Sequence, residues 1–266
     1  MSLFNFRLRH PDHIVPWGKE GNHSLHWFGL TDGEYWIKSP EATLFEYTVE
    51  AVKYFERPPA ERYADYQITR LVEDLFDILE DVHVSVPGHL FEMVDTAEKL
   101  VAYLNRVDKW REGEPDDTLT DEFIENSEAL ASWLSTRHID SLHFINGPYI
   151  WLLRNGERIT IVWHTEGTTD KGDNFWTAAP GQYEMSYAAF VEEVTSFAKN
   201  FFDAMEKQVA MSIEKDWKDV KLDKQNLARE QEERRARSEK IIEKLREKES
   251  HFDWTKTENA IRDLLK

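Results

Sequence analysis

The first 50 residues alternate apolar and polar side chains with the period of β-strands. This alternation predicts a half-buried strand over residues 4–8. Within Leu25–Ile37, two apolar runs rich in aromatic residues flank the pair Asp32-Gly33, and Asp-Gly is a strong signal for a hairpin turn. We therefore expect an antiparallel hairpin over residues 25–37, followed by a further strand near 43–49.

The middle of the chain changes to the period of helices. A Pro58-Pro59 pair ends the strand region and is expected to open a helix, because apolar residues then recur three or four positions apart over residues 68–82, with carboxylates on the opposite side. Two further amphipathic stretches predict helices over about 95–110, with a capping arrangement at its start, and over about 121–136. The charged stretch between them is expected to be a loop.

Strand patterns then return before a helical C-terminal part. We predict strands over 142–145, 149–153 and 158–164, and Asn155-Gly156 between the last two is a signal for a type I′ hairpin turn. The following stretch over residues 166–172 is polar and glycine-rich, which predicts a mobile loop.

No glycine or proline follows residue 181, so the C-terminal part is expected to be helical. A dense apolar stripe over residues 187–205 predicts a buried helix. Residues 228–240 are polar all round, which is typical of a helix that projects into solvent. Thr255–Glu258 has the spacing of a capping box and predicts a last helix.

These elements together predict the α+β fold class, with one antiparallel sheet built from the N-terminal and central hairpins and packed against helices on one face. We expect a globular domain over residues 1–210 and a helical C-terminal extension over residues 211–266. Five tryptophans lie in or near the predicted strands and are expected to pack in the core, although some could stand exposed as anchors for a partner: Trp27, Trp36, Trp151, Trp163 and Trp176.

Charge is the first indication of function. The chain has 33 basic and 51 acidic side chains, and residues 41–140 alone carry 9 basic and 24 acidic ones. An acidic surface repels nucleic acid and attracts a basic partner, although acidity also serves solubility. The absence of cysteine excludes disulfides and thiolate metal sites. Without a signal-peptide pattern or a membrane-length apolar run, the chain is expected to be cytoplasmic and not to act at a membrane.

Candidate chemistry is sparse. Two histidine pairs have ligand-like spacing, with Asp12 or Asp32 as further donors: His10/His13 and His23/His26. Residues three apart on a strand face opposite sides, so we expect no metal site and no other cofactor. The acidic cluster over residues 112–122 lacks the order of an EF-hand. Phosphate-loop and serine or cysteine nucleophile motifs are absent, and the mixed-charge residues 229–248 lack the net positive charge of a nucleic-acid site.

The N-terminal motifs resemble one known family. Phe4-Asn-Phe-Arg-Leu8, Pro16-Trp17-Gly18 and the aromatic stretch 25–37 are similar to the N-terminal signature of a family of bacterial proteins described only as a domain of unknown function. The resemblance implies a bacterial cytoplasmic protein. It implies no activity, no catalytic residues and nothing about the C-terminal helices.

Three hypotheses about function follow. The first is an acidic protein-binding module, most concretely an immunity protein that occludes a basic toxin, with contacts expected from five acids: Asp116, Asp117, Asp121, Glu122 and Glu125. The alternative is an enzyme with a site near the aromatic stretch that uses His26, Asp32 and Glu34. The third is a scaffold that forms homo-oligomers through the C-terminal helices.

Overall fold

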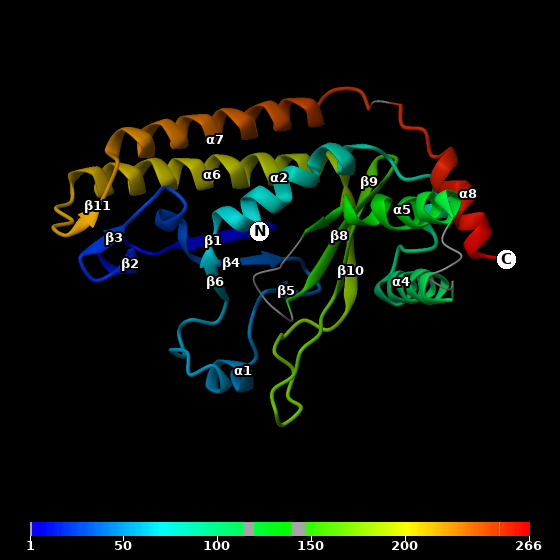
Figure 1. Cartoon of the computed structure of the whole chain (residues 1–266), viewed down its shortest axis with the longest axis horizontal. Helices are drawn as coiled ribbons and strands as arrows, with labels where there is room; N and C mark the ends of the chain where they lie inside the picture. The colour runs from blue at the N-terminus through cyan, green and yellow to red at the C-terminus, as the bar shows by residue number, and fades with distance from the viewer. Residues whose placement is uncertain (1, 114–119, 140–146, 250) are drawn as a thin grey trace.

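The computed structural model describes residues 2–113, 120–139, 147–249 and 251–266. It confirms the α+β class: antiparallel sheets pack against helices, and a long pair of helices runs along the top of the molecule (Figure 1). The helices are α1 (Val49–Tyr54), α2 (Thr69–His83), α3 (Gly88–Phe91), α4 (Ala97–Glu112), α5 (Asp121–Ser135), α6 (Tyr187–Glu214), α7 (Lys224–Leu245) and α8 (Thr255–Leu264), with short 3-10 turns η1 (Pro11–His13) and η2 (Gly29–Thr31).

The first sheet is organised around strand β4 (Asp32–Lys38). Strand β1 (Phe4–Leu8) pairs with one edge of β4, while β5 (Thr43–Leu44) and β6 (Ala64–Gln67) pair with β4 as well, all antiparallel. The strand predicted for residues 4–8 is therefore confirmed. Only the start of the strand predicted near 43–49 forms, because Phe45 adopts a positive φ of 65° that interrupts extended backbone.

The hairpin predicted for residues 25–37 is wrong. Asp32-Gly33 lies at the start of β4, and the residues before it form η2 in place of a first strand. The glycine serves close packing between strands: a Cβ on Gly33 would overlap the carbonyl oxygen of Arg7 and come within 2.8 Å of the Ile68 side chain. The sequence Asp-Gly fits both a turn and a strand glycine that close packing requires, so the sequence alone could not distinguish the two.

A second antiparallel sheet has the order β10-β9-β8-β7 and is separate from the first, so the single sheet we expected is not formed. It comprises β7 (His138–Ile139), β8 (Tyr149–Asn155), β9 (Arg158–His164) and β10 (Gly181–Ser186). The strands β7 and β10 were not predicted. The β8–β9 hairpin is confirmed, with Gly156 and Glu157 as its two loop residues. Gly156 alone of these has a positive φ, of 59°, which fits a type II′ turn better than type I′. The strand predicted at 142–145 lies outside the described residues.

A small third sheet joins the N-terminal region to the connection between α6 and α7. Strands β2 (Trp17–Lys19) and β3 (Asn22–Ser24) form a hairpin, and β11 (Val220–Lys221) pairs in parallel with β3. The connection between α6 and α7 is thereby fixed to the N-terminal region.

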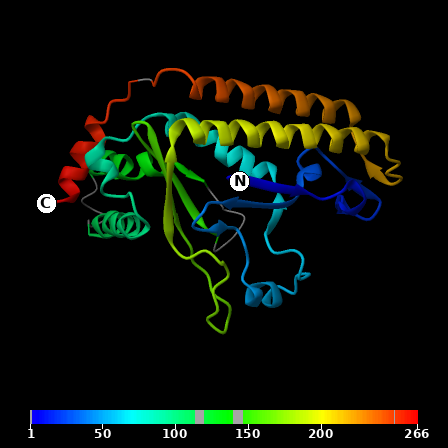
Figure 2. The same cartoon turned by 180° about the vertical axis from the view of Figure 1, so that it is seen from behind.

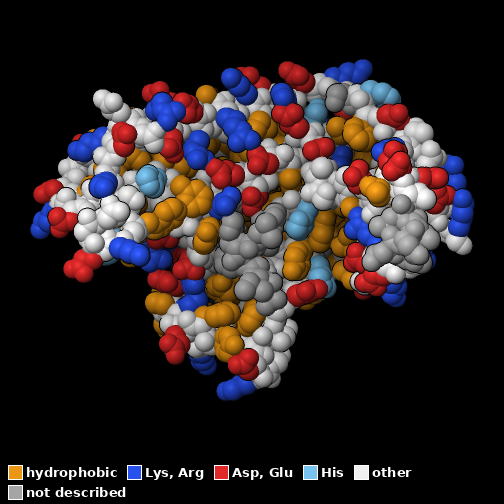
Figure 3. Space-filling view, in the orientation of Figure 1, with side chains coloured by type: hydrophobic (Ala, Val, Ile, Leu, Met, Phe, Trp, Pro, Cys, Tyr) orange, Lys and Arg blue, Asp and Glu red, His pale blue; other side chains and the backbone are white. Residues whose placement is uncertain are grey.

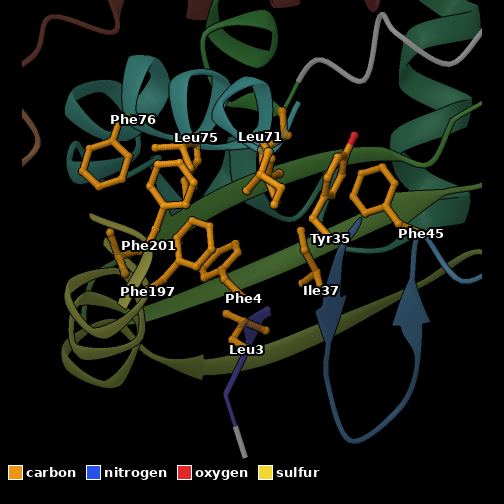
Figure 4. Packing of buried hydrophobic residues seen from close by; sticks show 14 of the residues in the cluster. Leu3, Phe4, Tyr35, Ile37, Phe45, Leu71, Leu75, Phe76, Phe197 and Phe201 are labelled. Carbon is orange, nitrogen blue, oxygen red and sulfur yellow. The ribbon is translucent and has the colours of Figure 1, made fainter. Parts of the chain in front are cut away.

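The second sheet separates two hydrophobic clusters. Ile150 and Leu152 of β8 pack with the first sheet, α2 and α6, whereas Trp151 and Leu153 pack with α4, α5 and α8 on the other side. Both faces of this sheet are therefore buried, and not one face as expected. In Figure 4, aromatic and aliphatic side chains from β1, β4, α2 and α6 meet in the larger cluster. Its labelled members are Leu3, Phe4, Tyr35, Ile37, Phe45, Leu71, Leu75, Phe76, Phe197 and Phe201.

Most of the helices predicted from the apolar periodicity are confirmed. α2, α4 and α5 lie where they were predicted, although α2 begins at Thr69, well after Pro58-Pro59, because β6 comes between. The capping arrangement predicted at Asp95–Glu98 for the start of α4 lies one residue later: Thr96 is the N-cap and accepts a hydrogen bond from the Lys99 amide. The predicted capping box of α8 is absent, since its N-cap position is Trp254. Every residue of the predicted apolar stripe of α6 is buried: Tyr187, Phe190, Val191, Val194, Phe197, Phe201, Phe202 and Met205.

Helix α7 does not project into solvent, contrary to the prediction for residues 228–240. It lies along α6 in both views, and α2 also contacts it (Figures 1 and 2). Its polar Gln231 and Ser238 are buried, and its arginines pair with carboxylates of the neighbouring helices, as in Arg235–Asp203 at 2.6 Å and Arg237–Asp77 at 2.6 Å. The domain boundary at residue 210 and oligomerisation through the C-terminal helices stay predictions. Among the described helices, none is long and apolar enough to cross a membrane.

Candidate functional site

The polar face of the first sheet brings together two of the three residues of the predicted enzyme site. Asp32 and Glu34 are two positions apart on β4 and so lie on the same face. Glu34 is buried and pairs with Arg7, directly opposite on β1, while Asp32 lies 3.1 Å from Arg9 Nε. The Arg9 guanidinium also reaches Asp65, at 3.8 Å.

An open groove of about 480 Å³ lies beside this face, and Arg7, Arg9, His13, Glu34 and Glu61 contribute its charged or titratable lining. Burial raises the pKa of Asp32, although Arg9 acts to lower it. His26 is exposed and is not among the residues that line the groove. The structure thus joins the two carboxylates to arginines and does not add the histidine to them.

The histidine pairs do not assemble a metal site. The His10 and His13 rings are 6.4 Å apart, and His10 Nδ1 accepts a hydrogen bond from the Asp12 amide at 3.3 Å. His23 lies in β3, opposite Gly18. Within the part of the chain that the structure describes, no three histidine or carboxylate side chains are close enough to hold a metal ion.

The predicted partner contacts fall on and before helix α5. Asp116 and Asp117 lie outside the described residues. Asp121, Glu122 and Glu125 are exposed on α5, and the exposed Glu128 extends their charge by one more turn. The helix contains no lysine or arginine.

The acidic charge of α5 is only weakly compensated by a basic side chain nearby. Lys256 of α8 lies 3.5 Å from Glu125, but both side chains are more than half exposed, and such a pair contributes little energy. Asp121 and Glu122 also stabilise the helix, because they lie in its first turn, where the helix dipole favours negative charge. Glu125 and Glu128 lie beyond that turn, so the dipole does not account for them.

A buried polar cluster escaped the sequence analysis. His83 ends α2, Arg154 lies in β8 and Tyr187 begins α6, and all three are more than nine-tenths buried. The Tyr187 hydroxyl lies 2.8 Å from His83 Nδ1, and the Arg154 guanidinium stacks 3.9 Å above the Tyr187 ring. Because 71 and 104 positions separate His83 from its two partners, no local pattern could have revealed this cluster.

Electrostatics make this cluster a structural network. Burial and the Arg154 charge lower the pKa of His83, and burial raises the pKa of Tyr187 to about 12. At neutral pH the imidazole is therefore neutral and the phenol protonated, so the hydroxyl donates to Nδ1. Glu249, after α7, contacts both sides of the cluster: its carboxylate lies 3.6 Å from Arg154 Nη2 and accepts a hydrogen bond from the Ser85 amide at 2.6 Å.

Comparison with known proteins gives a family without an assigned activity. No curated protein and no solved structure matches the chain. Residues 3–260 match the sequence profile of a family of unknown function (DUF5984), so the match includes α7 and most of α8 as well as the N-terminal motifs. The chain therefore belongs to the family of unknown function DUF5984.

Proposed function

We propose that the chain is a cytoplasmic protein-binding module whose α5 surface receives a basic partner. One observation carries this proposal: α5 exposes Asp121, Glu122, Glu125 and Glu128 and has no basic residue of its own. Exposed like charges that are only weakly compensated within the molecule repel one another, and they are useful where a complementary surface approaches.

The charge distribution supports the same proposal. Residues 41–140, which include α5, hold most of the net charge of −18. A field of one sign accelerates the encounter with an oppositely charged protein and aligns it before contact. Repulsion of nucleic acid by the same field argues against a nucleic-acid partner.

The most concrete form of this function is that of an immunity protein. Proteins that act on nucleic acid carry basic surfaces because they bind phosphates. An acidic protein that covers such a surface blocks access to the substrate by occlusion. The acids of α5 would then replace the phosphates as partners of the toxin's lysine and arginine side chains.

The test uses basic proteins encoded next to this chain in its source genome. Each is co-expressed with the full chain, and growth and complex formation by size-exclusion chromatography are measured. We expect one of them to form a complex, and its toxicity to be relieved. No complex and no relief with any of them would refute the proposal.

A matched pair of variants locates the surface. The first reverses charge on α5 with Asp121→Lys, Glu122→Lys and Glu125→Lys. The control makes the same change in net charge on the exposed side of α7, with Glu232→Lys, Glu239→Lys and Glu243→Lys. We expect binding to weaken by more than about tenfold in the first variant and by clearly less in the control. Equal weakening would mean that only net charge matters.

The groove beside β4 favours one alternative, an enzyme. Glu34 lines the groove, and Asp32 lies on the same face with a raised pKa, as titratable groups in active sites often have. Incubation of the full chain with a metabolite extract, followed by mass spectrometry, tests it. If the chain is such an enzyme, the wild type converts a metabolite and the Asp32→Asn variant does not. Extracts that are identical after incubation with the two proteins would refute the alternative.

A further inference from the structure

Helix α1 lies on a protrusion at the bottom of the molecule, together with the loop between β9 and β10 (Figure 1). Hydrophobic surface covers much of this protrusion in Figure 3. Three large apolar side chains of this short segment are exposed: Val49 by 60%, Tyr54 by 45% and Phe55 by 44%. We call Tyr54, Phe55 and the adjoining Glu56 the α1 tip.

The aromatic rings of the α1 tip are held in place by a line of ring contacts that leads into the core. Phe55 packs against Phe175 at 5.0 Å and against Tyr47 at 5.7 Å between ring centroids. Tyr47 in turn stacks on the buried Trp176 at 4.6 Å. Rigid, exposed aromatic side chains lose little conformational entropy on binding, which is why such residues dominate the energy of protein interfaces.

The backbone at the α1 tip adopts a conformation that ordinarily belongs to glycine. Glu56 has a positive φ of 52°, and it follows the last helical turn. The Arg57 amide donates to the Val52 carbonyl and the Glu56 amide to the Lys53 carbonyl, which is the Schellman pattern of a helix C-terminus. Glycine is the preferred residue at this position, so the carboxylate of Glu56 is present at the expense of stability.

The charges around the α1 tip define the partner. The exposed acids of α1, Glu56 and the loop between β9 and β10 are Glu50, Glu56, Glu166, Asp170 and Asp173, against the exposed bases Lys53 and Lys171. The negative charge of Asp170 raises the pKa of the Tyr54 hydroxyl, so acidic charge lies near the edge of the ring. The surface is therefore an apolar centre with a predominantly acidic rim.

We infer that the α1 tip is the anchor by which this chain binds a protein partner, inserting Phe55 and Tyr54 into an apolar pocket bordered by lysine or arginine. The inference rests on the proposed function in that the partner is a basic protein. It adds a second contact surface, on a different element from the acids of α5. This surface supplies two aromatic anchors, whereas the large apolar side chain that α5 exposes is the aliphatic Ile124.

The first test places the photo-crosslinking residue p-benzoylphenylalanine at position 55 of the full chain, expressed in cells of its source organism. We expect an adduct with another protein, crosslinked at a peptide in which apolar residues adjoin lysine or arginine. No adduct, an adduct only with a second copy of this chain, or an adduct only with lipid would each overturn the inference.

The second test measures the affinity of the purified crosslinked protein for variants of the full chain. Phe55→Ala should weaken binding by about 30-fold or more, as truncation of a hot-spot aromatic does. Phe252→Ala is the matched control, because Phe252 has the same 44% exposure but lies between α7 and α8. Equal affinities of these two variants would overturn the inference. Circular dichroism checks that both variants are folded.

Glu56→Gly separates binding from stability. Glycine relieves the positive φ, so this variant should unfold at a higher urea concentration than the wild type and yet bind its partner several-fold more weakly. Unchanged affinity would show that the carboxylate has no part in binding. If charge reversal on α5 weakens the complex but Phe55→Ala does not, the inference that the α1 tip binds the partner is refuted, whereas the proposed function stands.

Discussion

Gln231 connects helix α7 to the rest of the fold, and its replacement tests how much this connection contributes to the free energy of unfolding. Its side chain is buried and makes two hydrogen bonds: the Trp27 indole Nε1–H donates to Oε1 at 2.9 Å, and Nε2 donates to the Phe202 carbonyl at 2.9 Å. Trp27 itself is fully buried. The perturbation is Gln231→Leu, which keeps a side chain of similar size and removes both polar groups.

The magnitude follows from the groups that are left without partners. An unpaired buried N–H of the indole costs about 1–3 kcal/mol. The Phe202 carbonyl lies within α6, where it still accepts a backbone hydrogen bond of the helix. Losing the bond from Gln231 therefore costs less at this carbonyl than at the indole N–H. Leucine adds apolar burial but creates no large cavity. We therefore expect Gln231→Leu to lower the free energy of unfolding by about 2 kcal/mol.

Urea denaturation of the full chain, followed by tryptophan fluorescence and circular dichroism, measures this change. Glu232→Leu is the control: its side chain is the exposed neighbour on α7, and the change should stay within about 0.5 kcal/mol. In the double variant with Trp27→Phe, the indole N–H is absent, so part of the loss caused by Gln231→Leu should disappear. Equal stabilities of Gln231→Leu and Glu232→Leu would refute the packing of α7 on the core.

Two further variants test other parts of the fold. Because burial and Arg154 lower the pKa of His83 below its unfolded value of 6.5, the unfolded chain binds more protons between these two pKa values, and stability should fall as the pH drops below 6.5. Urea titrations from about pH 7 to about pH 5 should show this loss in the wild type and a smaller loss in His83→Gln; parallel curves would contradict the assignment. Gly33→Ala should lower the free energy of unfolding by about 1–3 kcal/mol, because its Cβ would meet β1 and Ile68. Gly113→Ala, which meets only ordinary contacts, should be neutral or stabilising, and similar losses in both alanine variants would argue against the close strand packing.

Hydrophobic periodicity was sufficient to predict the positions of elements whose buried faces are apolar. α2 and α6 present continuous apolar stripes, and the β8–β9 hairpin alternates between two clusters, so their positions could be predicted. The same criterion failed for α7. Its buried Gln231 is polar, and only the bonds to Trp27 and Phe202 explain its burial.

Contacts between distant segments explain the other differences. The pair Asp32-Gly33 has the chemistry of a turn, but the approach of β1 makes glycine necessary within a strand. Exposure of Tyr54 and Phe55 could not be read from their apolar character, which predicts burial. The acids of α5 were found because charge excess, unlike packing, is visible in the sequence itself.

In the function that we propose, the acidic face of α5 receives a basic protein. The most direct measurement is the affinity between the full chain and the basic protein encoded beside it, by calorimetry at about 0.05 M and about 0.2 M salt. We predict binding that weakens markedly at the higher salt concentration, and a loss of more than about tenfold at low salt when Asp121, Glu122 and Glu125 are replaced by lysine. Binding that is insensitive to both changes, or no binding at low salt, would contradict the claim.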